Sequence, residues 1–109
     1  MANTFKLKTK ANVGVTTVGI YTAPAATTTV VIGITLSNTS GSGVNVGVGL
    51  TRAGTTEDVK LLKNAPIPQG SSLEFMGGNK VVLETTDTLT VDSDTNNSID
   101  AALTIMEIT

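Results

Sequence analysis

The sequence contains no cysteine, no histidine and no tryptophan, and it has only one tyrosine and two phenylalanines among 109 residues. Without cysteine it can form neither a disulfide nor a thiolate metal site, so cysteine usage gives no information on the redox compartment. Without histidine, acid–base chemistry at neutral pH would have to use carboxylates, lysines or Tyr21. We therefore predict that the protein is not an enzyme and that it has no catalytic residue, no cofactor and no structural metal.

Charge is also scarce, because only 15% of the residues are charged and the formal net charge is −2. A chain of this charge is not expected to bind nucleic acid through its whole surface. No window approaches the roughly 18 apolar residues that a membrane span needs, and no apolar segment typical of a signal peptide follows Met1. The many threonines suit a polar, uncharged surface of the kind found on extracellular or virion proteins. We expect neither a nucleic-acid partner nor a membrane partner.

The sequence does contain a regular alternation of apolar and polar residues on both sides of a turn. Apolar side chains stand at every second position from Val30 to Leu36 and again from Val44 to Leu50. Between these stretches lies the glycine- and serine-rich segment 38–43. A period of two on both sides of such a turn predicts a pair of antiparallel strands with one buried face.

Similar short segments continue to the end of the chain, and further strands are expected in or near residues 13–22, 57–63, 71–76, 81–84, 88–91 and 99–108. Pro66 and Pro68 remove two backbone donors, so segment 64–70 is expected to cross between two sheets. About eight or nine strands with frequent turns predict an all-β fold, an antiparallel β-sandwich of the jelly-roll or immunoglobulin-like type, in one domain over residues 13–109. The predicted core consists of Val30, Ile32, Ile34, Leu36, Leu73, Phe75, Leu89, Val91, Leu103 and Ile105.

Residues 1–12 differ from the rest, because three lysines alternate there with two apolar residues and no acidic residue is present. As an extended chain, this segment shows one cationic and one apolar side. It is interpreted as a docking arm that becomes ordered on a partner or as an added edge strand, and the alternative is a permanent first strand of the sandwich. In the first two cases we predict that a partner protein with an acidic surface binds Phe5, Lys6, Leu7, Lys8 and Lys10.

The acidic segment 91–100 places oxygen-bearing side chains at alternate positions, as a calcium-binding loop between two helices does. However, Asn97 stands where such a loop needs glycine, and Leu103 stands where it needs a bidentate glutamate. The segment is also flanked by strands, which favours a hairpin turn with local hydrogen bonds. Asp92, Asp94 and Asp100 therefore remain only weak candidates for cation ligands.

A characteristic order of turns and strands runs from residue 18 to residue 108. Its segments are Tyr21-Thr22-Ala23-Pro24, Ser37-Asn38-Thr39, the crossing from Pro66 to Leu73, the strand from Val81 to Glu84 with Thr86-Asp87, the strand from Leu89 to Val91, and a final amphipathic strand that ends at Glu107-Ile108. This order resembles small β-sandwich virion proteins of tailed bacteriophages, particularly marine and cyanobacterial phages. That group is similar to capsid decoration (cement) proteins. The resemblance brings no catalytic motif, and it does not include segment 5–10.

The resemblance implies a structural virion protein that is made in the host cytoplasm and lies on the capsid exterior. Such a decoration protein would bind the major capsid protein or other virion proteins and stabilise the head shell, and we expect a homo-oligomer, specifically a trimer. A neck, tail or fibre accessory protein of the same virion class is an alternative. A host-adhesion module that binds carbohydrate is a further alternative, although sugar faces usually stack on aromatic residues, which are rare here.

Overall fold

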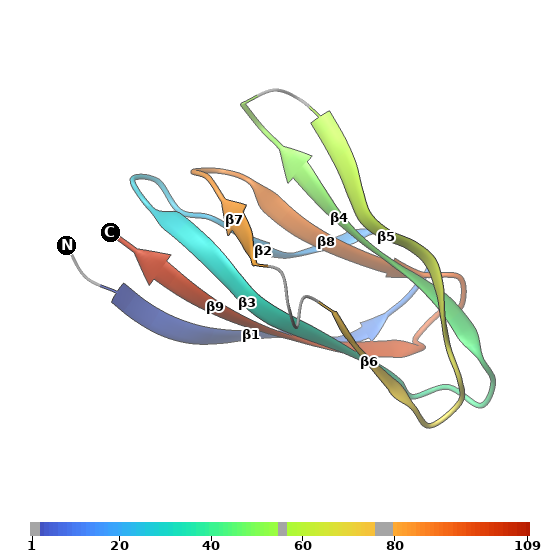
Figure 1. Cartoon of the computed structure of the whole chain (residues 1–109). Helices are drawn as coiled ribbons and strands as arrows, with labels where there is room; N and C mark the ends of the chain where they lie inside the picture. The colour runs from blue at the N-terminus through green and yellow to red at the C-terminus, as the bar shows by residue number, and fades with distance from the viewer. Residues whose placement is uncertain (1–2, 55–56, 76–79) are drawn as a thin grey trace.

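Nine β-strands and no helix occur in residues 3–54, 57–75 and 80–109, which are the residues that the computed structural model describes (Figure 1). The strands are β1 (Asn3–Val13), β2 (Val18–Thr22), β3 (Thr28–Asn38), β4 (Val44–Arg52), β5 (Glu57–Ile67), β6 (Ser72–Phe75), β7 (Val81–Leu83), β8 (Thr88–Ser93) and β9 (Ile99–Ile108). Within the described residues, no helix is long and apolar enough to cross a membrane.

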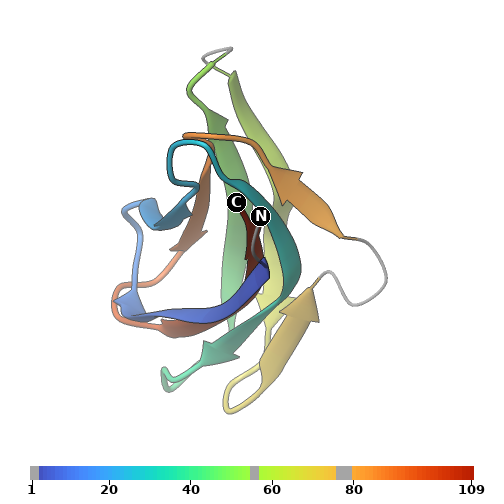
Figure 2. The same cartoon turned by 90° about the vertical axis from the view of Figure 1, so that its left-hand side faces the viewer.

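The strands form two sheets that pack face to face (Figure 2). In sheet A the order is β1-β9-β3-β6, and β7 pairs with another stretch of β3. In sheet B the order is β2-β8-β4-β5. Every pairing between neighbouring strands is antiparallel. The predicted all-β antiparallel β-sandwich is therefore confirmed.

The core lies between the two sheets and is built from alternate residues of the long strands. Along β9, the residues at positions 99, 101, 103 and 105 are buried, and β4 and β8 contribute buried valines and a leucine from the opposite sheet. Burial of such a side chain contributes about 1.5–3 kcal/mol. Leu73 is half-buried, and the side chain of Phe75 lies outside the described part of the chain. Of the predicted core residues, those found buried are Ile34, Leu36, Leu89, Val91, Leu103 and Ile105.

The alternation of β3 changes phase at Ile32, where this strand has one residue more than its neighbour β9. Val31 and Gly33 pair with consecutive residues of β9, so Ile32 forms a β-bulge between them. Residues up to Val31 are buried at odd positions, whereas Ile34 and the following buried residues stand at even positions. The prediction that Val30 and Ile32 are core residues was therefore wrong, and both are half-buried on the outer side of sheet A.

Two strand boundaries also differ from the sequence prediction. Strand β5 continues through Pro66 to Ile67, so the crossing from sheet B to sheet A is shorter than predicted. Because β5 is an edge strand, the missing N–H of Pro66 does not interrupt a neighbouring strand. In addition, the predicted strand over residues 13–22 is divided, since β1 ends at Val13 and β2 begins at Val18. Segment 77–79, whose two glycines and one asparagine predict a turn after the strand at 71–76, lies outside the described residues.

Candidate interaction surface

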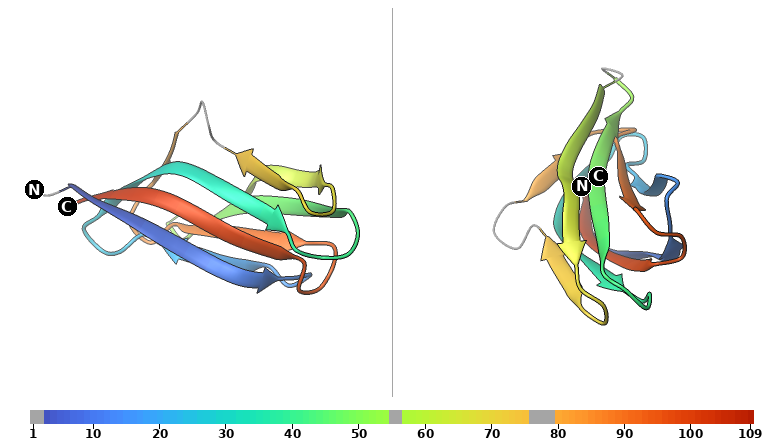
Figure 3. Two further views of the ribbon diagram at one scale, coloured as in Figure 1. Left: turned by 90° about the horizontal axis from the view of Figure 1, so that it is seen from below. Right: turned by 90° about the vertical axis from the view of Figure 1, so that its right-hand side faces the viewer.

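Strand β1 forms one edge of sheet A and pairs with β9 along nearly its whole length (Figure 3). The register is continuous from Asn3 to Lys10 and shifts only before Val13. No other described strand pairs with the opposite side of β1. The structure places residues 3–13 in an edge strand of the chain's own sheet A, because they pair with β9, rather than in an arm that is separate from the sandwich. Residues 1–2 lie outside the described part of the chain.

The two faces of β1 carry different chemistry. The lysines pair with core residues of β9, so they lie on the inner side of sheet A. Sheet B does not cover them, because Lys6 and Lys10 are exposed and Lys8 is half-buried. Phe5 and Leu7 lie on the outer side and are 69% and 66% exposed. The structure therefore places all five predicted partner-binding residues on one edge strand, with the cationic and apolar groups on opposite sides.

A polar cluster of Lys6 with three buried side chains holds the N-terminal half of β1 against the rest of the sandwich. Glu107 on β9 forms an ion pair with Lys6, whose Nζ lies 2.9 Å from Oε1. It also accepts a hydrogen bond from the Tyr21 hydroxyl at 2.5 Å. The Tyr21 and Thr29 hydroxyl oxygens are 2.8 Å apart. Because the single phenol proton is donated to Glu107, the Thr29 hydroxyl donates to Tyr21. The cluster thus joins β2 of sheet B to β1, β3 and β9 of sheet A.

Burial and hydrogen bonding in this cluster favour a neutral Tyr21 phenol beside a charged Glu107 carboxylate. The hydrogen bond from Tyr21, followed by that from Lys6, lowers the pKa of Glu107. Burial, followed by the hydrogen bond to Glu107, raises the pKa of Tyr21 to about 12. The Glu107 contribution to stability is therefore present above its ordinary pKa and is lost as the pH falls through its lowered pKa. The Tyr21 contribution is present below pH 10 and is lost as the pH rises from 10 through about 12.

We expect Tyr21→Phe to lower the free energy of unfolding by about 2 kcal/mol at neutral pH, because it removes a hydrogen bond to a carboxylate and the acceptor of Thr29. The wild-type protein should also lose up to about 2–3 kcal/mol above pH 10, where Tyr21 ionises, and the variant should lack that part of the loss. Urea unfolding between pH 7 and 12 measures both effects. Thr22→Val, which removes an exposed hydroxyl from the same strand, is the control. Identical alkaline profiles for Tyr21→Phe and the wild type would contradict the assignment.

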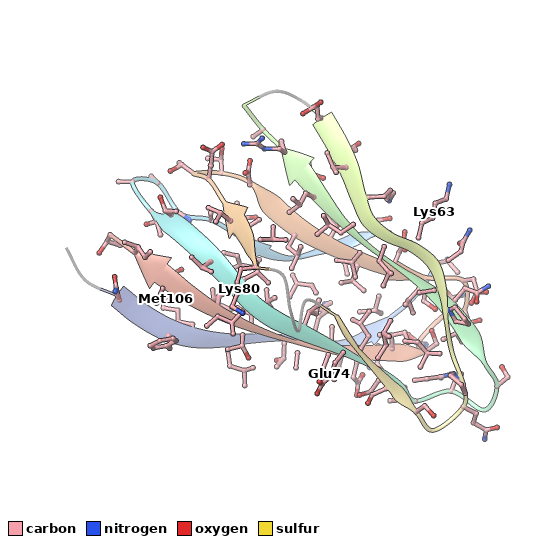
Figure 4. All side chains as sticks on the ribbon, viewed as in Figure 1. Lys63, Glu74, Lys80 and Met106 are labelled. Carbon is pink, nitrogen blue, oxygen red and sulfur yellow. The ribbon has the colours of Figure 1, made fainter. Side chains whose placement is uncertain are left out.

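The outer side of sheet A carries a row of apolar side chains that crosses four strands in register. Phe5 pairs with Met106, Met106 with Val30, and Val30 with Val82. Met106 is labelled on β9 in Figure 4. Val82 is 54% exposed, and Met106 and Val30 are half-buried. Single exposed apolar residues are common, whereas a contiguous group of them is typical of an interaction site.

Next to this apolar row, the outer side of sheet A is hollowed where the residues are small. Thr9 pairs with Ala102, Ala102 with Thr35, and Thr35 with Glu74. A shallow trough runs over these positions, and its lining includes Gly33 and the neighbouring Thr104. The outer face therefore combines the apolar row with a trough lined mostly by small residues.

The structure separates the three acidic residues that were weak candidates for a cation site. Asp92 accepts a hydrogen bond from the Thr17 hydroxyl at 3.0 Å, and Asp100 accepts one from the backbone of Asn12 at 3.0 Å. Asp94 accepts from the backbone N–H of Asn45 at 3.1 Å. Each carboxylate thus accepts its hydrogen bond from a different loop or strand. Among the described residues, no group of three or more acidic, histidine or cysteine side chains could hold a metal ion.

A second group of charged residues has a structural role at the β7–β8 turn. Asp87, which is buried, accepts a hydrogen bond from the backbone N–H of Glu84 at 3.0 Å and an ion-pair contact from Arg52 at 3.3 Å. Arg52 also pairs with the carboxylate of Glu84. These contacts provide hydrogen-bond partners for the turn and join it to β4.

The sequence reasoning missed the roles of Glu107 and Tyr21. A signal for Glu107 was present, because it continues the alternation of buried residues at positions 99, 101, 103 and 105. A carboxylate on a buried face requires a hydrogen-bonding or charged partner. Its partners Lys6 and Tyr21 come from β1 and β2, and Tyr21 in turn contacts Thr29 of β3, so they could be identified only once the order of the strands was known.

No protein-family model matches the chain, and no curated protein matches it. Among solved structures, the chain is similar to a protein of Bacillus endospore appendages, which form a novel family of disulfide-linked pili. The TM-score is 0.57, the sequence identity is 16%, and the match covers 99% of this chain and 87% of the other. At this identity the similarity concerns the fold alone.

Proposed function

We propose that this chain is a non-enzymatic structural subunit of a particle built from many protein copies, and that it decorates the shell of a virion. Its activity is binding, and sheet A supplies the binding surface. The resemblance of segments 18–108 to phage virion proteins supports the choice of particle. The trimer expected from that resemblance is part of the same proposal.

The apolar row on the outer side of sheet A is the observation that carries the proposal. Four side chains from four different strands form it, and Phe5 and Val82 are more than half exposed. Burial of such a row against a shell protein would contribute about 25 cal/mol for each Å² of apolar surface removed from water. A decoration protein needs only modest affinity at each contact, because many bound copies together stabilise the assembled shell.

Quantitative mass spectrometry of particles purified from the producing cells tests the proposal. A decoration protein should approach the copy number of the most abundant shell subunit. A copy number of about a dozen to a few tens for each particle would instead indicate a neck, tail or fibre component. Absence of the chain from purified particles, while it is abundant in the same cells, would overturn the proposal.

The structural similarity to a pilus protein favours a second candidate, a subunit of a surface filament. The described strands form the same kind of all-β fold over nearly the whole chain. However, this chain has no cysteine, so it cannot form the disulfide links that characterise those pili. A filament of this protein would have to be held by non-covalent contacts, and negative-stain electron microscopy of the same purified material would distinguish filaments from isometric particles.

A further inference from the structure

The two sheets have several open edges, and the edge of β1 differs from the others among the described strands. Strand β2 has five residues and a register shift, and β6 and β7 have four and three residues. Strand β5 is long, but it contains Pro66 and two register shifts. Short length, bulges and proline are the usual features that prevent an edge strand from pairing with another chain. Strand β1 lacks all three between Asn3 and Lys10.

The feature that β1 does have is positive charge on its inner side. Lys6 is paired with Glu107, whereas Lys8 and Lys10 have no ion-pair partner among the described residues. Antiparallel pairing of β1 with β1 of a second copy would place lysines beside lysines on the same side of the sheet, which is destabilising. Strand β5 of a second copy carries Glu57 and Asp58 as well as Lys60 and Lys63, so charge alone does not exclude it, but Pro66 and two register shifts hinder regular pairing along β5. The charge pattern therefore disfavours pairing of β1 with β1 of a second copy.

Protection against self-association does not explain the outer side of the same strand. Phe5 and Leu7 are the most exposed large apolar side chains among the described residues, and they alternate with the lysines. Exposure of two such side chains on a free, regular edge increases the tendency of that edge to bind an extended chain. Together, the cationic inner side and the apolar outer side of β1 restrict which side chains an added strand can carry on each of its faces.

We propose that the free edge of β1, from Asn3 to Lys10, binds an extended segment of a different protein as an added strand whose side chains alternate between acidic and apolar. The acidic side chains would lie beside Lys8 and Lys10 on the inner side, and the apolar ones beside Phe5 and Leu7 on the outer side. Backbone hydrogen bonds would hold the segment, and the side chains would set its register. This inference rests on the proposed structural role and specifies the partner of that surface.

Synthetic peptides provide the test, and the first probe is a fluorescein-labelled peptide of alternating glutamate and valine with blocked ends. Three controls isolate what is recognised. The first has the same composition with all glutamates before all valines, the second replaces glutamate by lysine, and the third carries N-methyl groups on alternate amides, so that it cannot pair as a strand. We expect the alternating acidic peptide to bind at least tenfold more tightly than each control, as measured by fluorescence anisotropy on the full chain at low salt.

A charge-reversal variant then locates the site. Lys8→Glu with Lys10→Glu leaves the Lys6–Glu107 pair in place, and it should bind the acidic peptide at least tenfold more weakly and bind the lysine–valine peptide instead. The single variant Lys10→Glu, at an exposed position, gives the same direction of change if the double variant does not fold. Amide hydrogen exchange should show new protection in β1 when the acidic peptide is bound.

Several results would overturn the inference. Equal binding of the block-sequence peptide, or equally tight binding of a single-stranded oligothymidylate, would mean that charge alone is recognised. Unchanged binding by the charge-reversal variants would mean that the peptide does not bind beside Lys8 and Lys10. Absence of binding at millimolar peptide would also overturn the inference. Particle composition is measured independently. A chain that is abundant in particles but binds no peptide refutes only this inference, whereas peptide binding by a chain absent from particles refutes only the proposed function.

Discussion

Replacing Ile34 by aspartate should remove most of the free energy of unfolding at room temperature. The Ile34 side chain is 2% exposed and lies in the core between the two sheets. The substitution removes about 1.5–3 kcal/mol of burial and places a carboxylate among apolar side chains, at a further cost of several kcal/mol. Because domains of this size are stable by only about 5–15 kcal/mol, a loss of that size removes most of the stability. Far-UV circular dichroism and urea titration measure it.

Ile32→Asp is the matched control, because it makes the same change two positions earlier on the same strand. An uninterrupted alternation would place both residues in the core, whereas the bulge places Ile32 on the outer side beside the trough. We therefore expect Ile32→Asp to cost about 1 kcal/mol or less. Equal unfolding by both variants would mean that the bulge is absent. A melting profile of Ile34→Asp that matches the wild type would mean that the core was assigned wrongly.

Ile32 and Ile34 show which features of the fold an alternating sequence pattern can predict and which it cannot. Strands β4, β8 and β9 each have one face in the core, so the alternation of their residues predicts which side chains are buried. The bulge at Ile32 is not visible in that pattern, because it is a mismatch in length between β3 and its neighbour β9. Local periodicity gives the number and type of strands, while the register between distant strands comes from pairing.

The candidate interaction surface likewise depends partly on the local sequence pattern and partly on pairing between distant strands. The alternation of lysines with Phe5 and Leu7 predicts the two chemically different sides of β1, and this part was available from the sequence. The pairing of β1 with β9 depends on residues about a hundred positions apart, and so do the apolar row and the contact of Lys6 with Glu107. An interaction surface assembled from four strands therefore requires the topology as well as the pattern.

The amide of Asn38 occupies a site at the end of β3 in which every hydrogen bond of the side chain is made. Its Nδ2 group donates to the carbonyl oxygens of Ser42 at 2.8 Å and Ile67 at 2.9 Å. Its Oδ1 atom accepts from the backbone N–H and the hydroxyl of Ser40, at 2.9 and 2.7 Å. The residue is 4% exposed, so water does not compete for these contacts. Asn38 thus joins the β3–β4 turn to the end of β5.

We expect Asn38→Asp to lower the free energy of unfolding by about 3 kcal/mol or more at pH 7, although the two side chains have nearly the same shape. The new oxygen would lie at the position of Nδ2, against two carbonyl oxygens, so two hydrogen bonds are lost and a buried charge faces two acceptors. These neighbours should raise the pKa of the new carboxyl above its unfolded value of about 3.9. The deficit should therefore be largest at neutral pH and should shrink as the pH falls towards 4, where the acid can donate to one carbonyl.

Asn64→Asp provides the control, since Asn64 is exposed on the edge strand β5 and the substitution adds the same charge. Its free energy of unfolding should stay within about 0.5 kcal/mol of the wild-type value. Urea titrations of both variants at pH 4 and pH 7 separate a general effect of added charge from the local one. If Asn38→Asp and Asn64→Asp lost the same small amount at both pH values, the Asn38 amide would not hold the turn. A deficit specific to Asn38 that grows with pH shows that one donor group, placed between two carbonyls, joins β3 to the end of β5.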